Sequence, residues 1–155
     1  MVKTTCEQPQ DLEEVLKDYL DDEEVKKMCD YKAHGGISVY AHCLNVADLS
    51  DRIDKALGSK CDRKTLLLGA LLHDFYLYDW HDARVFVNVF KMHGYTHPET
   101  ACQNAIRCFD VDEGVQEVIR CHMWPLTLFH FPSSREAMIV CMADKICALK
   151  ETFTR

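Results

Sequence analysis

The sequence contains no long apolar segment and no paired-cysteine motif. Its longest strongly apolar run, around residues 65–72, is far too short to cross a bilayer. The first ten residues, MVKTTCEQPQ, have no apolar signal region. There are nine cysteines, an odd number, and none belongs to a CxxC pair. These absences argue against a membrane protein and against a disulfide-bonded secreted protein, so we expect a cytoplasmic protein with free thiols.

Basic residues are also in short supply. The 18 lysines and arginines are outnumbered by 25 aspartates and glutamates, which gives a formal net charge of −7. General nucleic-acid binding requires a basic surface, so this balance argues against that class of protein. An acidic protein can still bind an anionic substrate if divalent cations reverse the local field. No repeat, low-complexity tract or flexible linker divides the 155 residues, and we expect one domain over residues 1–155.

The spacing of apolar residues predicts helices along the first part of the chain. A helix is expected over about 12–20, and a shorter one around 25–29. A loop is expected over 32–36, where two adjacent glycines disfavour regular structure. Ser38 is suited to cap the next helix, which covers about 39–57.

The middle of the chain carries the most apolar predicted helix. Asp62 is suited to cap a helix over about 63–76 that is apolar on nearly every side, which favours a central position. The stretch 79–92 fits both a strand and a helix, and we favour a helix because no other segment offers a strand partner. His97-Pro98 is expected to begin the following helix, because proline suits the first helical position.

Two more helices are predicted towards the carboxyl end. Asp112 is suited to cap a helix that ends by Pro125, and Ser133 or Ser134 to cap the last one. The sequence therefore predicts an all-α, single-domain bundle of roughly seven or eight helices.

Six side chains that bind metals well lie in five separate segments of the chain, each attached to an apolar helical face. By helical periodicity they point inwards, where charged and polar groups are costly unless something cationic meets them. They are His42, the pair His73-Asp74, His97, His122 and Asp144.

Taken singly, the histidines have ordinary explanations. His42 shares a face with apolar neighbours, as a hydrogen-bonded core histidine would. The pair His73-Asp74 could begin a turn, and His97 could be a helix cap. His122, near a helix carboxyl end, could be an imidazolium stabilised by the helix dipole.

Asp144 has no such ordinary explanation. It lies in mid-helix on the same face as Val140 and Ala148, where a lone carboxylate costs several kcal/mol. The adjacent Lys145 is rotated by about 100° and cannot neutralise it on that face. Together the six side chains indicate a metal site, and imidazoles with carboxylates suit Fe, Mn, Ni, Co or Zn.

The order of these residues resembles the HD-domain superfamily of metal-dependent phosphohydrolases. The resemblance covers about residues 34–150. It implies that His42, His73, Asp74 and Asp144 hold one metal ion, and that His97 and His122 bring in a second one with Asp74 as the bridge. The matching segments are SVYAHCLNVA with His42, GALLHDF with His73 and Asp74, HGYTHPETA with His97, VIRCHMWPL with His122 and MADKICAL with Asp144.

The resemblance implies the hydrolysis of a small phosphorylated substrate, a phosphomonoester or phosphodiester, with a nucleotide among the candidates. A metal-bound hydroxide would be the nucleophile, oriented by Asp74 and Asp144. Two alternatives stay open. One is a mixed-valent diiron oxygenase on the same scaffold, and the other is a non-catalytic metal-binding domain.

Four further residues are candidates for contact with the substrate. Lys145 and Arg135 are suited to bind phosphate oxygens. His81 and His93 are candidate proton donors or partners of the ligands. Phe-Tyr-Leu follows His73-Asp74 at 75–77, where many HD domains have a small residue and a lysine. This difference argues against carrying a nucleotide substrate over from the family.

Overall fold

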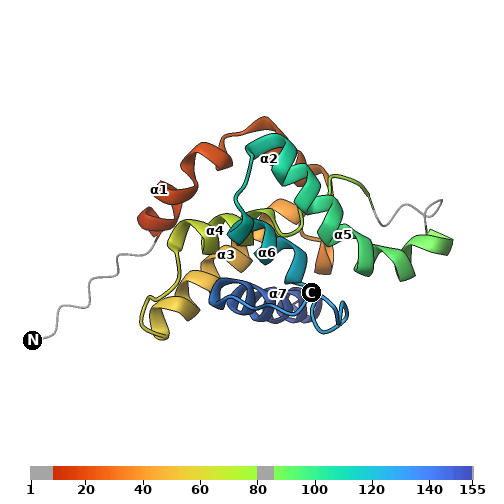
Figure 1. Ribbon diagram of the computed structural model, residues 1–155. Coiled ribbons are helices and arrows are strands. Elements are labelled where there is room, and N and C mark those ends of the chain that lie inside the picture. Colours follow the sequence, from red (N-terminus) through yellow and green to blue (C-terminus); the bar gives the residue numbers. More distant parts are fainter. Residues whose placement is uncertain (1–8, 80–85, 155) are drawn as a thin grey trace, which may run out of the picture.

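The chain folds into a helical bundle (Figure 1). The computed structural model describes residues 9–79 and 86–154, and for 9–11 and 86–93 it describes the backbone alone. Within these residues there are seven α-helices and no strand, which confirms the predicted all-α class. The elements are α1 (Pro9–Leu20), α2 (Glu23–Lys26), η1 (Lys27–Asp30), η2 (His34–Gly36), α3 (Val39–Ala56), α4 (Arg63–Leu72), α5 (Phe86–Phe109), α6 (Glu113–Cys121) and α7 (Arg135–Phe153), where η denotes a short 3-10 helix.

The predicted caps begin their helices as expected. The side chains of Ser38, Asp62 and Asp112 accept hydrogen bonds from backbone N–H groups three residues later, at the starts of α3, α4 and α6. Of the two serines proposed for α7, Ser134 is the cap, and its hydroxyl accepts from the N–H of Ala137. Each cap satisfies a backbone donor that has no partner within the helix.

Helix α4 lies at the centre of the bundle, where it contacts α1, α3, α6 and α7 (Figure 1). Every residue from Leu66 to Leu72 is buried, as the nearly continuous apolar character predicts. Gly69 sets the closest approach to α6, because a Cβ atom at this position would lie 2.5 Å from Cγ1 of Val118. The lack of a side chain at 69 therefore allows the carboxyl ends of α4 and α6 to lie side by side.

Two predicted helix boundaries were wrong. Helix α4 ends at Leu72 and not near Tyr76, so His73 and Asp74 lie in the turn that follows it. Pro98 does not begin a helix, because α5 continues through it from Phe86 to Phe109. Proline lacks the N–H that would bond to the preceding turn, which is why the sequence favoured a break there. Packing against α6 and the turn after α4 outweighs the loss of that one hydrogen bond.

The segment 32–36 is more ordered than a plain loop, since its last three residues form η2. Gly35 has a φ of 64°, and a Cβ atom there would lie 2.0 Å from the carbonyl oxygen of Glu151. Glycine therefore allows η2 to pack directly on the last turns of α7. Of the stretch 79–92, residues 80–85 lie outside the described residues, and 86–92 are helical as predicted.

The remaining expectations about composition concern thiols and membranes. The eight cysteines within the described residues are all free thiols, so none of them forms a disulfide. Among the helices of the described residues, none has the length and apolar character needed to span a membrane.

Candidate metal centre

The six predicted metal-binding side chains come together in the interior of the bundle. Helix α3 supplies one, the turn after α4 two, α5 one, the turn after α6 one and α7 one. All six are buried, with exposed fractions of 0% for His42 and His73, 8% for Asp74, 4% for His97, 1% for His122 and 7% for Asp144.

On one side of the cluster, two histidines face Asp144. Oδ1 of Asp144 lies 3.1 Å from Nε2 of His42 and 3.5 Å from Nε2 of His73. The same two nitrogens are 3.9 and 3.5 Å from Oδ2 of Asp74. His42, His73, Asp74 and Asp144 therefore form one compact set of nitrogen and oxygen donors.

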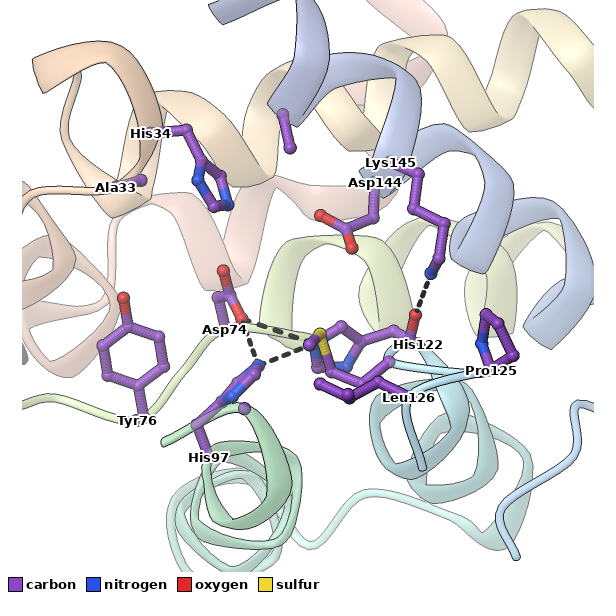
Figure 2. Close-up of a pocket in the computed structure, with 13 residues that line it drawn as sticks. Ala33, His34, Asp74, Tyr76, His97, His122, Pro125, Leu126, Asp144 and Lys145 are labelled. Carbon is purple, nitrogen blue, oxygen red and sulfur yellow. Dashed lines mark hydrogen bonds and ion pairs between the residues drawn. The ribbon is translucent and has the colours of Figure 1, made fainter. Parts of the chain in front are cut away.

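On the other side, the second oxygen of Asp74 faces a different pair of histidines (Figure 2). Oδ1 of Asp74 lies 3.3 Å from Nε2 of His97 and 3.5 Å from Nε2 of His122, and these two nitrogens are 2.9 Å apart. Asp74 thus directs one oxygen to each histidine pair. A carboxylate placed in this way is suited to bridge two cations.

The ends of α4 and α6 orient two of the rings in the same manner. His73 and His122 each occupy the C-cap position. Their Nδ1 atoms lie 2.7 Å from the carbonyl oxygens of Ala70 and Ile119, respectively. These carbonyls belong to a last helical turn that needs donors, and because a carbonyl can only accept, Nδ1 carries the proton. Nε2 of each ring is therefore the atom that faces the cluster.

A carboxylate on α7 orients the third ring. Nδ1 of His42 donates to Oε2 of Glu151 over 2.7 Å, and Nδ2 of Asn45 donates to the other oxygen over 3.0 Å. Such contacts on the far nitrogen hold a ligating imidazole in place and increase its basicity. Sequence reasoning missed Glu151. Its spacing of seven residues from Asp144 places both on one face of α7 and was an available signal.

The donor set fits a divalent transition metal. Imidazole nitrogen and carboxylate oxygen are its only donors, and both suit such ions. Nε2 of His73 and Oδ1 of Asp74 are buried and make no hydrogen bond within the described residues. A bound cation would satisfy both atoms. Three groups of ligand atoms within 4.8 Å of one another could each hold an ion: His42-His73-Asp74, His73-His122-Asp144 and Asp74-His97-His122.

The charges of the cluster compensate one another. Burial raises the pKa of Asp144, but the hydrogen bond with His42 and the nearby His73 ring outweigh burial and hold that pKa below its usual range. Burial lowers the pKa of His42, but its contacts with Asp144 and Glu151 raise that pKa to about 10. Without metal, these shifts favour ionised Asp144 and a protonated His42. A divalent cation bound here would displace that proton.

A cavity of about 550 Å³ opens beside the cluster (Figure 2). Four of the candidate ligands, Asp74, His97, His122 and Asp144, line it. Two further polar side chains do so, His34 from η2 and Lys145 from α7. The other lining residues are aromatic or apolar: Ala33, Tyr76, Gly94, Met123, Pro125, Leu126 and Ala148.

Lys145 lies at the cavity, as the prediction that it contacts the substrate requires. Its Nζ donates to the carbonyl oxygen of His122 over 2.8 Å, and to the carbonyl oxygen and Sγ of Cys141 over 3.2 Å each. The ammonium group thereby ties α7 to the turn that carries a ligand. It also places a positive charge beside the cluster.

His34 also lines the cavity, and sequence reasoning missed it because its segment was predicted to be a loop. Its ring meets that of His42 edge to face, with 5.5 Å between the ring centres. Burial and the neighbouring His42 lower the pKa of His34.

Of the remaining candidates only Arg135 has a described side chain, and it does not line the cavity. Arg135, the first residue of α7, donates to the carbonyl oxygen of Leu57 over 3.3 Å. Its predicted contact with a substrate has no support from this geometry. His81 lies outside the described residues, and of His93 only the backbone, within α5, is described.

Comparison with known proteins identifies the family. No curated protein and no solved structure matches the chain. The HD domain matches residues 39–149, which includes all six residues of the cluster and most of the chain. The chain belongs to the HD domain family.

Proposed function

We propose that the protein is a metal-dependent phosphohydrolase that cleaves a phosphomonoester or phosphodiester. The observation that carries the proposal is the position of Asp74, which directs one oxygen to each of two histidine pairs at the edge of a cavity. Membership of the HD domain family supports the same reaction class. One or two ions of Fe, Mn, Ni, Co or Zn suit this donor set.

Bound cations would supply the Lewis acid that polarises the phosphoryl group and lowers the pKa of a water molecule. The chain itself supplies the framework. Asp74 and Asp144 hold negative charge at defined places, and the Nδ1 contacts of His42, His73 and His122 aim their Nε2 atoms at the centre. Because the rings cannot turn freely, the donor geometry is set before any ligand arrives.

An anionic substrate must be attracted despite the net charge of −7. Bound cations would reverse the local field, and Lys145 adds a positive charge at the wall of the cavity. We propose that this ammonium exchanges one of its backbone acceptors for a phosphate oxygen of the substrate. His34 stands across the cavity and can donate a ring N–H to the same phosphate (Figure 2).

The test begins with the metal content of protein purified without added metal. The protein is then reconstituted anaerobically with Mn²⁺ or Co²⁺ and assayed on p-nitrophenyl phosphate and bis-p-nitrophenyl phosphate. We expect metal-dependent release of p-nitrophenol, and we expect Asp144→Asn to reduce it by about 100-fold or more. Asp48→Asn is the matched control, because this carboxylate on α3 is 62% exposed and should leave the rate unchanged.

Other results would select one of the alternatives. Substrate-dependent oxygen uptake by the iron form, with a mixed-valent diiron signal in electron paramagnetic resonance, would replace the hydrolase by an oxygenase. Bound metal without turnover of any ester would leave a metal-binding domain.

A further inference from the structure

A second hollow adjoins the cavity beside the candidate metal centre, and Leu126 lines both. The α6–α7 loop (residues 122–134) forms one wall of both. The second hollow, of about 380 Å³, is lined by Tyr95, Leu126, Thr127, Leu128, Phe129 and His130. We call it the outer hollow. Leu126 lines both spaces, and the adjacent residues Gly94 and Tyr95 of α5 line one each. The two spaces therefore meet at Leu126.

The outer hollow is formed by strongly exposed apolar side chains. Phe129 is 100% exposed, Leu128 71% and Tyr95 57%. Contiguous apolar surface of this kind is uncommon on a monomeric protein and marks binding sites. The exposure extends from the outer hollow towards the metal centre through Leu126, which is 45% exposed.

The exposure does not result from a loosely attached loop. Two turn hydrogen bonds hold the loop. The N–H of Leu126 donates to the carbonyl oxygen of Met123 over 2.9 Å, and the N–H of His130 donates to the carbonyl oxygen of Thr127 over 3.0 Å. The loop is tied to α7 where Sγ of Cys141 donates to the carbonyl of Trp124 over 3.2 Å. The backbone is thus held in place while its apolar side chains face outwards.

We propose that the substrate is an amphiphilic phosphate ester. Its phosphate lies at the metal centre between His34 and Lys145, and its alkyl chain passes over Leu126 into the outer hollow. This inference rests on the proposed function. In the reaction, water adds to phosphorus, the P–O bond to the alkyl oxygen breaks, and that oxygen leaves as the alcohol with one proton from the water.

The charge of the protein favours a dispersed amphiphile over a lipid bilayer. Membranes rich in anionic lipid attract basic segments, whereas this chain has a net charge of −7. The two spaces adjoin at Leu126, and one of them is lined by the candidate ligands, which favours a single molecule that occupies both. We therefore assign the outer hollow to the chain of the substrate.

The test measures binding and turnover over one series of chain lengths. Ethyl-, butyl-, hexyl- and octylphosphonate, which cannot be hydrolysed, are titrated calorimetrically into the Mn²⁺-reconstituted protein below their aggregation concentrations. Burial of a methylene group strengthens binding by up to about fourfold, and we expect about two- to fourfold per methylene. The corresponding alkyl phosphates should show the same trend in kcat/KM.

Two variants test whether the alkyl chain of the substrate occupies the outer hollow. Leu128→Ser and Phe129→Ser replace exposed side chains of the outer hollow, so they should fold, and we expect the chain-length dependence to flatten from butyl onwards. Phe153→Ser is the matched control, because this residue is 82% exposed at the end of α7 and does not line either space. It should retain the full chain-length dependence.

The outcomes separate the two proposals. Equal affinity for ethyl- and octylphosphonate would overturn the assignment of the outer hollow and leave the hydrolase proposal intact. The same holds if affinity still depends on alkyl chain length as in the wild type in both Leu128→Ser and Phe129→Ser. Chain-length-dependent binding without hydrolysis of any alkyl phosphate would overturn the proposed function and leave the amphiphile site. Binding that appears only with anionic vesicles would assign the apolar surface to a membrane. A wild-type dimer that Phe129→Ser converts to a monomer would assign it to a second copy of the chain.

Discussion

Replacing Gly69 by alanine is expected to destabilise the protein, although alanine is the better helix former. The new Cβ atom would lie 2.5 Å from Cγ1 and 2.7 Å from Cβ of Val118, whereas carbon atoms in contact are about 3.5–4.0 Å apart. Removing glycine from a helix interior gains about 0.5–1 kcal/mol. Overpacking a core typically costs about 1–3 kcal/mol. We therefore expect a net loss of about 1–2 kcal/mol in the free energy of unfolding.

The same substitution should weaken metal binding. His73 and His122 lie four residues after Gly69 and Val118, and their ring centres are 4.9 Å apart. Separating α4 from α6 to relieve the clash moves the two rings apart. The variant should therefore bind its metal less tightly even where it is fully folded.

Urea unfolding of the metal-free protein, followed by circular dichroism, measures the loss of stability. Mass spectrometric metal analysis of the folded variant measures the effect on the centre. Val118→Ala removes Cγ1 and Cγ2, two of the three close atoms, and leaves Cβ, so the double variant should recover part of the loss, about 1 kcal/mol relative to the sum of the single changes. A Gly69→Ala protein as stable as the wild type, with its full metal content, would show that the contact between α4 and α6 does not constrain the site.

Three further predictions concern charges and ligands. Glu151→Gln should lower metal affinity by about 10- to 100-fold in competition with a chromogenic chelator, and an unchanged affinity would show that this carboxylate does not orient its histidine. Burial raises the pKa of Asp51, but hydrogen bonds from Arg63 and Lys55 outweigh burial and lower it. A pKa lowered on folding contributes stability above the unfolded value of about 4, and this stability is lost as the pH falls through the folded value. Asp51→Asn should therefore cost about 2 kcal/mol at pH 7 and progressively less below pH 4 in urea titrations, and a cost independent of pH would contradict this. His97→Ala should reduce the number of bound ions without unfolding the chain, and an unchanged stoichiometry would indicate a mononuclear site.

Much of the fold followed from local chemistry. The caps Ser38, Asp62 and Asp112 were predicted because short polar side chains satisfy the free N–H groups at helix starts. The central place of α4 followed from its nearly continuous apolar surface. Pro98 was misjudged, since a missing hydrogen bond is a local signal and the packing that compensates for it is not.

By itself, the sequence determined which side chains form the buried polar cluster, because six imidazole and carboxylate groups on apolar helical faces are costly to bury unless they meet one another. Only the tertiary structure decided their mutual geometry. The two-sided position of Asp74, the contact of His42 with Glu151 and the meeting of two hollows at Leu126 depend on contacts between distant segments. Helical periodicity states which way a residue points relative to its own helix. It does not state which residues of other helices lie opposite that side chain, because the packing of the helices decides this.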